Sequence, residues 1–487
     1  MEEQARRKRN LFTFPAGTLG RDAVYALVTN YLLTFILFTH TLTTAQITAI
    51  TAIMIAARVF DALNDPIMGN IIERTRSRIG KFKPWLIAGV LSTAVVIYLM
   101  FNVQLTGWKF VIFFGIIYFA FSITYTMNDI AYWGMIPALS SDADARNQFT
   151  SRATLCAGIG GTLAMMLIPI FTTGTNAIGG NAAHAYGVVA LVIAIIAPLF
   201  LTITVIGTRE NREERTMPQE KFSLKEVFSK IRRNDQLMII SGIFLLQQIG
   251  NGLVTGGIGS TYIYVTYGYE GGLYSLFTTI GMSVTAFMVI FYPAISRRMH
   301  RKQLSGVMMV VATIGYVLML LSGLLPGNGS LKFGGLIIGY MLCNLGQYCF
   351  YLIMMISIMN TVEYNEYKFG TRDEGVVTSL RPFITKLSSA LIVAITSATY
   401  LISGVTQYTN RVSELEQQCN QGLITEADKL SRIETVLGEV SGGQGFALLL
   451  FMSLIPWLFM LVSYVLYKKK YQLDEAEYDR ICRELGK

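Results

Sequence analysis

The hydrophobic positions along the chain gather into twelve blocks, and clusters of turn-forming and charged residues separate one block from the next. Each block is long enough to form a helix of about 20 residues, the length that crosses a bilayer. Gly, Pro, Ser and Thr interrupt several blocks, as membrane helices tolerate. The pattern predicts an all-α polytopic membrane protein with 12 transmembrane helices. The blocks begin near Asp22, Gln46, Pro84, Lys109, Gln148, Ala185, Leu237, Tyr274, Ser305, Phe333, Val376 and Phe446.

The segments between the blocks predict the domain organisation. A charged stretch, 209–235, separates the first six blocks from the last six, which favours two six-helix bundles at 1–208 and 236–470 joined by a cytoplasmic linker. Within this linker, "SLKEVFSKI" has the spacing of an amphipathic helix, either on the membrane surface or in solvent. Residues 406–445 predict an extracytoplasmic helical insert, as a passive surface insertion rather than a cover over an outer vestibule. Residues 471–487 form a predicted cytoplasmic tail.

The composition and the distribution of charge narrow the class of protein. Of 487 residues, 52% are hydrophobic and only 15% are charged, which argues against a soluble protein. The net charge of +9 lies in alternate loops: "RRKRN", "RTRSRIGKFK" and "YKKKY" are basic, whereas "HTLTTAQ" and "TTGTNAIGGNAAHAYG" carry no Lys or Arg. This alternation is the positive-inside pattern. We therefore expect a protein of the cell (inner) membrane with both termini in the cytoplasm, with the lipid bilayer and not nucleic acid as its partner.

The sequence shows no pattern typical of an enzyme. Its five cysteines and three histidines follow no metal-ligand spacing, and it has no Walker-type glycine loop. We expect a protein without catalytic residues and without a cofactor, and we take a monomer as its working state.

Charged side chains inside the apolar blocks are the candidates for function. An ionisable side chain at the centre of a bilayer costs about 2.5–3.5 kcal/mol on insertion scales, so such residues usually face a cavity and act there. The charged residues of this kind are Asp22, Asp61, Asp65, Asp129, Arg152, Arg381 and Lys386.

The stretch "FDALNDP" predicts a cation site. Asp61, Asn64 and Asp65 stand at i, i+3 and i+4, so they share one face of a helix. Carboxylate, amide and hydroxyl oxygens are the ligands that a small hard cation prefers. Carboxylates this close cannot all stay ionised unless a proton or a cation neutralises them. We expect Na⁺ at Asp61 and Asp65, or a proton, and the neighbouring amide favours a coordinated ion.

A second stripe of polar and aromatic residues lies in the fourth block. Thr126, Asp129 and Trp133 stand at i, i+3 and i+7 and offer a hydroxyl, a carboxylate and a flat aromatic face. If the acids of both blocks face one cavity, Lys386 is the one deep positive charge that balances them. The alternative interpretation makes the acids fixed structural partners of the deep basic residues and makes Trp133 a packing residue.

These motifs resemble a known family. "GRDAVYAL", "FDALNDPIMGNIIERTRSRIGKFKPW", "NDIAYWGMIPAL" and "VEYNEYKFGTRDEG" are similar to the glycoside–pentoside–hexuronide:cation symporters of the major facilitator superfamily, and the resemblance runs through nearly the whole chain. It implies the major facilitator fold, with two six-helix bundles around a central cavity. It also implies symport of a glycoside or oligosaccharide into the cell, driven by Na⁺ or H⁺ through alternating access.

The resemblance also implies roles for individual residues. The implied cation ligands are Asp61, Asn64, Asp65 and Thr126. The implied substrate-binding residues are Asp22, Tyr25, Tyr125, Asp129, Trp133, Arg152, Arg381 and Lys386. The basic loop after the second block is interpreted as a cytoplasmic gate, with Glu73, Arg74 and Lys81 as its motif residues.

Arg381 departs from the family pattern. It can bind an acidic glycoside as a bidentate partner, or it can pair with the acidic loop around Asp373 and Glu374, and the structural role is favoured. Two other functions remain open. A transporter of lipid or another amphiphile with the same fold would have a cavity open sideways to the membrane, and a non-transporting sugar sensor would carry a soluble signalling domain.

Overall fold

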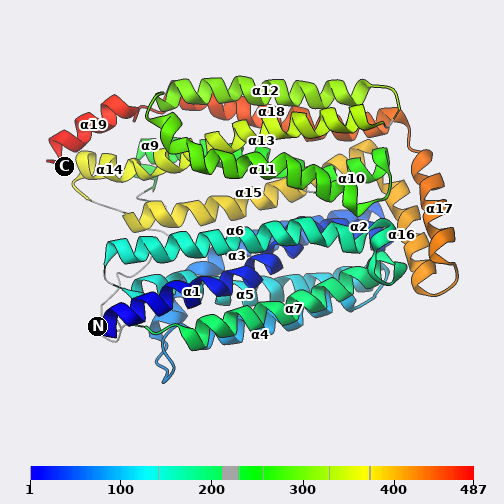
Figure 1. Cartoon of the computed structure of the whole chain (residues 1–487), viewed down its shortest axis with the longest axis horizontal. Coiled ribbons are helices and arrows are strands. Elements are labelled where there is room, and N and C mark those ends of the chain that lie inside the picture. The colour runs from blue at the N-terminus through cyan, green and yellow to red at the C-terminus, as the bar shows by residue number, and fades with distance from the viewer. Residues whose placement is uncertain are drawn as a thin grey trace. The chain divides into compact units, whose positions relative to one another are not determined.

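The computed structural model describes residues 2–140, 142–210, 229, 231–255, 257–327, 329–371 and 374–486. These residues form helices and short connections, and no strand occurs among them. Twelve of their helices are long and apolar enough to cross a membrane. The predicted all-α fold with 12 transmembrane helices is therefore confirmed (Figure 1). The predicted linker helix in "SLKEVFSKI" lies almost entirely outside the described residues.

The chain folds into two compact units. Unit 1 consists of Met1–Lys221, Gly268–Ser275 and Val405–Glu439. Unit 2 consists of Phe222–Tyr267, Leu276–Gly404 and Val440–Lys487.

The helices of unit 1 come mostly from the first half of the sequence. They are α1 (Glu2–Ala26), η1 (Leu27–Tyr31), α2 (Leu32–Thr39), α3 (Thr44–Arg74), α4 (Lys83–Asn102), α5 (Gly107–Leu139), α6 (Ala143–Thr172), η2 (Gly174–Asn176), η3 (Ile178–Gly180), α7 (Ala182–Gly207), α16 (Thr406–Asn420) and α17 (Glu426–Gly438). Those of unit 2 are α9 (Asp235–Thr255), α10 (Gly257–Tyr267), α11 (Gly271–Ser296), α12 (Arg301–Leu324), α13 (Ser330–Met359), α14 (Thr361–Phe369), α15 (Glu374–Ser403), α18 (Gly442–Lys470) and α19 (Glu475–Glu484). The first five residues of α11 belong to unit 1.

Local sequence signals determine where several helices begin. α3 starts with a capping box, because Thr43 accepts a hydrogen bond from the backbone of Gln46 and the Gln46 side chain accepts one from the backbone of Thr43. α18 starts with the same arrangement at Ser441 and Gln444. These bonds satisfy backbone N–H groups that a helix N-terminus leaves without partners.

The first membrane-spanning segment begins earlier than the sequence predicted. It runs from Arg6 to Thr39, so Asp22 lies well inside it, and the prediction that the first block begins near Asp22 is wrong. The charged pair does not end the helix because Arg21 and Asp22 neutralise each other, with Nη2 and Oδ2 2.7 Å apart. A paired charge costs much less in an apolar environment than a single one.

A π-helical turn interrupts this first segment. Residues Leu27–Tyr31 form η1 between α1 and α2, and the hydroxyl of Tyr31 donates a hydrogen bond to the carbonyl of Met165 at 2.6 Å. Single π turns inside α-helices are rare and occur frequently at functional sites. This turn begins two residues after Tyr25, one of the predicted substrate-binding residues.

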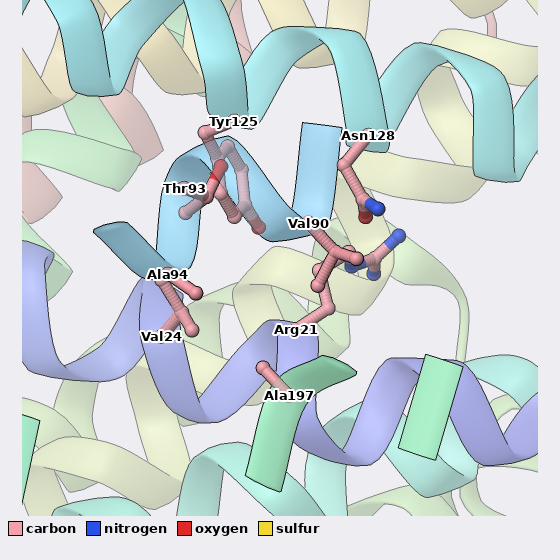
Figure 2. Close-up of a pocket in the computed structure, with 8 residues that line it drawn as sticks. All are labelled: Arg21, Val24, Val90, Thr93, Ala94, Tyr125, Asn128 and Ala197. Carbon is pink, nitrogen blue, oxygen red and sulfur yellow. The ribbon is translucent and has the colours of Figure 1, made fainter. Parts of the chain in front are cut away.

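Two glycines allow very close helix crossings inside unit 1. A Cβ atom on Gly20 of α1 would lie 2.5 Å from the Cα of Ala197 on α7. A Cβ atom on Gly89 of α4 would lie 2.7 Å from the backbone nitrogen of Asn128 on α5. Small residues let helix backbones approach closely in membrane proteins. At these crossings α7 packs closely on α1 and α5 packs closely on α4. The first crossing lies next to Arg21 on α1 (Figure 2).

The predicted insert forms two helices, α16 and α17, which we call the α16–α17 hairpin. It packs on the end of unit 1 where α2 ends and α3 begins. The side-chain amide of Asn410 donates to the carbonyl of Leu42 at 2.9 Å and accepts from its N–H at 3.0 Å. The Gln417 side chain donates to the carbonyl of Thr39 at 3.1 Å.

A buried ion pair anchors the same hairpin. Lys429 of α17 lies 3.2 Å from Glu416 of α16, and the two side chains are 0% and 1% exposed. Glu416 also accepts hydrogen bonds from the backbone of Ala182 and the side chain of Asn181, while Lys429 donates to the carbonyl of Gly180 at 2.7 Å. The hairpin is thus an integral part of unit 1.

Candidate functional site

Arg21 is the centre of the first polar cluster in unit 1. From α1, its guanidinium lies 2.7 Å from Asp22 Oδ2 and 3.1 Å from Asp129 Oδ1 on α5. Arg21 is buried, whereas both aspartates are half-buried. One guanidinium therefore holds two carboxylates that keep part of their surface accessible. The predicted substrate residues Asp22 and Asp129 come together in this way.

Aromatic rings surround the same guanidinium. Its central carbon lies 4.9 Å from the ring centre of Tyr132 and 5.0 Å from that of Trp133, within the range of cation–π attraction. Tyr25 of α1 and Tyr125 of α5 contact each other, with their ring centres 5.7 Å apart. Trp133 stays half-buried. The structure thus groups five of the predicted substrate residues on α1 and α5.

A second polar cluster joins α3 to α5. Ser122 donates a hydrogen bond to buried Asp61, and Arg58 forms an ion pair with the same carboxylate at 3.6 Å. One turn further along each helix, Thr126 donates to Asp65 at 3.4 Å. The predicted cation ligands on the two helices therefore face each other.

Asn64 takes its expected place on the α3 face between the two aspartates, and it is half-buried. Its amide nitrogen has no hydrogen-bond partner among the described residues. Among these residues no group of three or more His, Cys, Asp or Glu side chains could hold a metal ion. The chemistry that α3 and α5 offer is two carboxylates with hydroxyl and amide groups, a donor set suited to a weakly held monovalent ion or a proton.

The predicted charge balance, with Lys386 as the one deep positive charge, is wrong. Among the described residues of unit 1, two arginines are buried, Arg21 and Arg58, and they pair with Asp22, Asp129 and Asp61.

Sequence reasoning gave no role to Arg21, Arg58 or Ser122. A signal was present for two of them. Arg58 stands three residues before Asp61, and Ser122 stands four residues before Thr126, so each shares a helix face with a predicted ligand.

Arg152 does not join the substrate cluster. It lies exposed on α6, where its guanidinium donates to the carbonyl of Leu11 at 3.3 Å and covers the ring of Phe12 at 5.2 Å. Both contacts are with residues of α1 that precede Arg21 by nine or ten positions, and none is with Arg21, Asp22 or Asp129. Its substrate role therefore stays a prediction without a supporting contact.

Arg381 and Lys386 lie on α15 of unit 2. Arg381 is exposed and donates to the hydroxyl of Tyr351 at 2.8 Å, and Lys386 is half-buried. Asp373 lies outside the described residues, and the side chain of Glu374 is not described. The predicted pairing of Arg381 with this acidic loop stays a prediction.

The predicted gate loop lies between α3 and α4. Glu73 and Arg74 are exposed at the end of α3, and the backbone N–H of Lys81 donates to Glu210 at 3.3 Å. Gly80 has a φ of +124°, and a Cβ there would lie 2.4 Å from a Glu210 carboxylate oxygen. Glu210, which follows α7, thus holds the loop. The sequence analysis did not name this residue.

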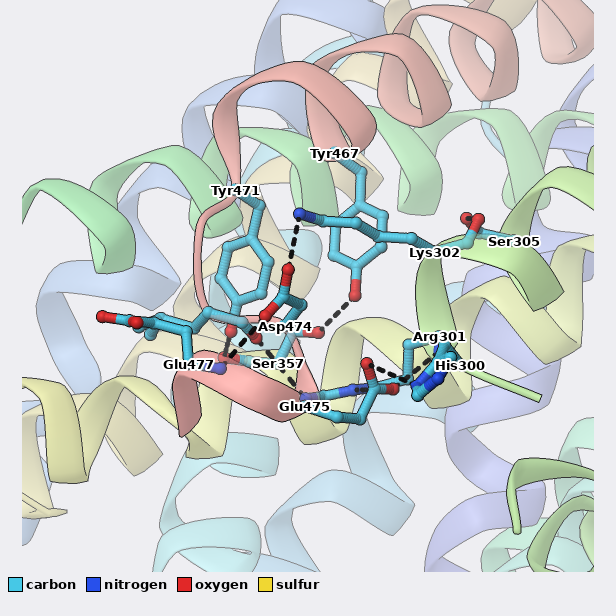
Figure 3. A network of polar contacts seen from close by, with 11 residues as sticks. His300, Arg301, Lys302, Ser305, Ser357, Tyr467, Tyr471, Asp474, Glu475 and Glu477 are labelled. Atoms are coloured by element: carbon cyan, nitrogen blue, oxygen red, sulfur yellow. Dashed lines mark hydrogen bonds and ion pairs between the residues drawn. The ribbon is translucent and has the colours of Figure 1, made fainter. Parts of the chain in front are cut away.

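Another charged network lies in unit 2, away from any predicted site residue (Figure 3). The backbone and guanidinium of Arg301 donate to Glu475 at 2.7 and 3.0 Å, and Lys302 lies 3.3 Å from Asp474. Burial acts to raise the pKa of Glu475, but the hydrogen bonds from Arg301 outweigh it, so this pKa lies below its ordinary value. The network fastens the C-terminal helix α19 to the start of α12, which is a structural role.

Comparisons with known proteins identify the family. Residues 13–475 match the family described as MFS/sugar transport protein. The chain is 27% identical over 501 residues to a lactose permease of Leuconostoc lactis, covering 98% of this chain and 71% of the permease. It is 27% identical over 410 residues to a raffinose carrier protein of Pediococcus pentosaceus, covering 80% of this chain and 62% of the carrier.

The fold matches solved transporters as well. A D-xylose–proton symporter aligns over 90% of this chain and 99% of its own, with a TM-score of 0.58 and 12% sequence identity. At this identity the likeness shows the fold alone. The protein is a multi-pass membrane protein that transports sugar and is not an enzyme. The chain therefore belongs to the MFS/sugar transport protein family, as a transporter of the glycoside–pentoside–hexuronide type within the major facilitator superfamily.

Proposed function

We propose that the protein couples the uptake of a glycoside or oligosaccharide to a cation, Na⁺ or H⁺, by alternating access in the cell membrane. Its working state is a monomer with both termini in the cytoplasm. The observation that carries this proposal is the position of both polar clusters on one helix. Thr126 and Asp129 are neighbours one turn apart on α5. Thr126 contacts Asp65 of the second cluster, and Asp129 contacts Arg21 of the first.

The cluster around Arg21 suits a sugar. Carboxylates accept hydrogen bonds from sugar hydroxyls, and the two carboxylates that Arg21 holds keep part of their surface accessible. The half-buried ring of Trp133 offers a flat face to the C–H side of a pyranose. The names of the relatives, a lactose permease and a raffinose carrier, support an oligosaccharide as the substrate class.

The cluster around Asp61 and Asp65 suits the coupling cation. Ser122 and Thr126 bring hydroxyl groups to these carboxylates, and Asn64 lies on the same helix face. Arg58 already shares Asp61, so a cation competes with a tethered guanidinium for that carboxylate. This competition favours weak, reversible ion binding, which a symporter needs because it must release the ion on every cycle.

A cation that binds one turn away from the sugar cluster can couple the two sites through α5. Cation binding fixes the Asp65–Thr126 contact, and that order passes along the helix to Asp129. One positive charge moving inward gains about 2.3 kcal/mol per 100 mV. A tenfold cation gradient adds about 1.4 kcal/mol. These gains together concentrate a neutral sugar without nucleotide hydrolysis, while the two halves rock around a central site.

Uptake into proteoliposomes tests the proposal. Radiolabelled lactose and raffinose are offered under an inward Na⁺ gradient, an inward H⁺ gradient, or neither. We expect accumulation above equilibrium under at least one gradient, and Asp65→Asn should abolish it while Asp142→Asn, a matched change at an exposed aspartate, should not. Equal uptake of sugar with and without both gradients would overturn the coupling.

The same preparation separates the alternatives. Redistribution of a fluorescent lipid analogue without sugar accumulation would favour the lipid transporter. Sugar binding with no uptake under any gradient would favour the sensor.

A further inference from the structure

A short piece of the C-terminal half of the chain packs inside unit 1. Residues Gly268–Ser275, which we call the α10–α11 connection, follow α10 and include the first turn of α11. The other residues of α10 and α11 belong to unit 2. The connection lies at the end of unit 1 where α6 ends and α7 begins, the same end that carries the α16–α17 hairpin.

Hydrogen bonds join the α10–α11 connection to the segment that follows α6. The Glu270 carboxylate accepts bonds from the backbone N–H of Thr175 at 3.4 Å and from the Thr175 hydroxyl at 3.3 Å. The backbone N–H of Gly271 donates to the carbonyl of Thr173 at 3.3 Å. Both the backbone and a charged side chain of the connection therefore hold it on unit 1.

A proline in α6 shapes the surface on which the connection docks. Pro169 has no N–H, so the carbonyl of Met165 lacks its helical partner, and the hydroxyl of Tyr31 donates to it at 2.6 Å. The hydroxyl of Ser275 in the connection donates to the next carbonyl, that of Met166, at 2.7 Å. This turn of α6 therefore offers carbonyl groups to side chains outside its own helix.

The close fit depends on a missing side chain. A Cβ atom on Gly271 would lie 1.6 Å from the carbonyl oxygen of Pro169, so no other residue fits here while the connection is docked. A Cβ atom on the next residue, Gly272, would meet no atom of the described residues within 4 Å. The two adjacent glycines thus differ in one respect only, which is contact with α6.

The α16–α17 hairpin is the second piece of chain that unit 1 receives from between helices of unit 2, and its contacts are of another kind. Its ion pair of Lys429 with Glu416 is buried, and exposing or separating buried charges is costly. The bonds of Glu270 in the α10–α11 connection are made at a half-buried carboxylate to the exposed Thr175, where water competes for them. The connection therefore releases more easily than the hairpin.

We propose that the α10–α11 connection is a latch, which docks on α6 and releases from it in every transport cycle, while the α16–α17 hairpin stays docked on unit 1. This inference rests on the proposed function, because alternating access requires the two halves to part at each face in turn. The connection is continuous with α10 and α11, so it loses its bonds to α6 when those helices move away from unit 1.

The roots of the hairpin allow it to stay behind. Gly404, between α15 and the hairpin, has a φ of +68°, a conformation that glycine adopts without strain. The side chain of Gln444 at the start of α18 donates to the carbonyl of Ser403 at 3.3 Å, so the two roots lie side by side. A pair of adjacent roots, one of them a glycine, can act as a hinge about which α15 and α18 turn.

A pair of cross-links tests the latch. Thr175→Cys/Glu270→Cys, joined by a short bifunctional maleimide, ties the α10–α11 connection to the end of α6. Gln104→Cys/Asn420→Cys is the matched control, because these exposed side chains are 2.9 Å apart and their cross-link ties the hairpin to the same unit. We expect the first cross-link to abolish gradient-driven uptake of labelled lactose or raffinose and the second to leave it at the level of the same variant before treatment.

The four single-cysteine variants, treated with the same reagent, control for modification of one cysteine alone and of the native cysteines. Undiminished uptake after the Thr175–Glu270 cross-link would overturn the latch. Equal loss of uptake with both cross-links would also overturn it, because the connection and the hairpin would then play the same part.

The adjacent glycines test the docking without a cross-link. Gly271→Ala forces the connection away from Pro169, so we expect hydrogen-exchange protection of residues 268–275 to fall at least about tenfold. Gly272→Ala should leave this protection unchanged, because open space surrounds that position. Protection of the α16–α17 hairpin should stay the same in both variants. Equal protection of the connection in the two variants would contradict docking through Gly271.

Exchange in the native protein separates failure of the latch from failure of the proposed function. After correction for intrinsic rates, the amides of the α10–α11 connection should exchange at least about tenfold faster than those of the α16–α17 hairpin. Equal protection of the two segments would overturn the latch. If the native protein accumulates neither lactose nor raffinose under any gradient, the proposed function fails, while this measurement still decides whether the connection releases more readily than the hairpin.

Discussion

Replacing Lys429 with methionine would remove one charge from the buried ion pair of the α16–α17 hairpin. The Lys429 and Glu416 side chains are almost fully buried and 3.2 Å apart, and methionine has a similar length without the charge. Glu416 would remain in the same buried position, still accepting hydrogen bonds from Ala182 and Asn181. The perturbation is therefore a single uncompensated carboxylate.

Two independent arguments give the size of the effect. Removing one partner of a buried ion pair typically costs about 3–5 kcal/mol. Alternatively, Glu416 takes up a proton: burial raises its pKa above the ordinary value of 4.5, and Lys429 opposes that rise in the native protein. Protonating a carboxyl of ordinary pKa at pH 7 costs about 3.4 kcal/mol, at about 1.4 kcal/mol per pH unit. Both arguments predict a loss of about 3–4 kcal/mol in the free energy that holds the hairpin on unit 1.

The sign of the pH dependence follows from the raised pKa. In Lys429→Met the folded hairpin binds a proton that the undocked hairpin releases, so its stability is present at low pH and is lost as pH rises through the folded pKa. Acidification from pH 7 toward pH 5 should recover about 1.4 kcal/mol per unit.

Hydrogen exchange measured by mass spectrometry reads the effect locally. At pH 7 the amides of α16 and α17 should lose protection by about two to three orders of magnitude in Lys429→Met, after correction for intrinsic exchange rates. The double variant Glu416→Gln/Lys429→Met should regain most of it, because no buried charge remains. Arg411→Gln, which breaks an exposed pair with Glu439 in the same hairpin, is the matched control and should change nothing measurable. Native protection in Lys429→Met, or equal loss in the control, would refute the anchoring role.

Three other variants test the remaining contacts. Arg21→Lys keeps the charge but loses the planar fork that reaches two carboxylates, so we expect the sugar Kd in equilibrium binding to rise about 10- to 100-fold. Thr126→Val removes the hydroxyl that contacts Asp65 and should raise the Na⁺ or H⁺ concentration for half-maximal uptake about 3- to 10-fold, with sugar binding at saturating ion unchanged. Glu475→Gln weakens the link to Arg301, so exchange protection of α19 should fall at neutral pH; in the native protein this protection is present above the ordinary pKa of 4.5 and is lost as pH falls through the depressed pKa.

Much of the fold could be predicted from the sequence because each membrane span carries its own signal. A run of apolar residues predicts a helix without knowledge of its neighbours. The same local logic placed Asp61, Asn64 and Asp65 on one face of α3. It failed at α1, where Arg21 and Asp22 suggested the start of an apolar block, because the sequence alone does not show that two adjacent charges pair.

The partners of the site residues could not be predicted in the same way. Periodicity tells which residues share a face of one helix, but not which residue of another helix meets them. Ser122 meets Asp61 only because α3 and α5 pack in a particular register. Arg152 is a charged residue inside an apolar block, as the site residues are, yet its position on α6 directs it to the carbonyl of Leu11. The docking of the α16–α17 hairpin depends on Gly180, more than 200 residues away from it in sequence.

The π turn at Leu27–Tyr31 has a consequence for how this transporter tolerates changes in length. An α-helix advances by about 100° per residue, and a π turn holds one residue more per turn, so this turn accommodates an extra residue without rotating the helix before it. One residue removed from the turn would restore a regular helix and leave Arg21 and Asp22 on the side that faces Asp129. A single-codon deletion here would therefore spare the carrier, whereas the same deletion in a regular helix would turn one part of that helix away from its partners.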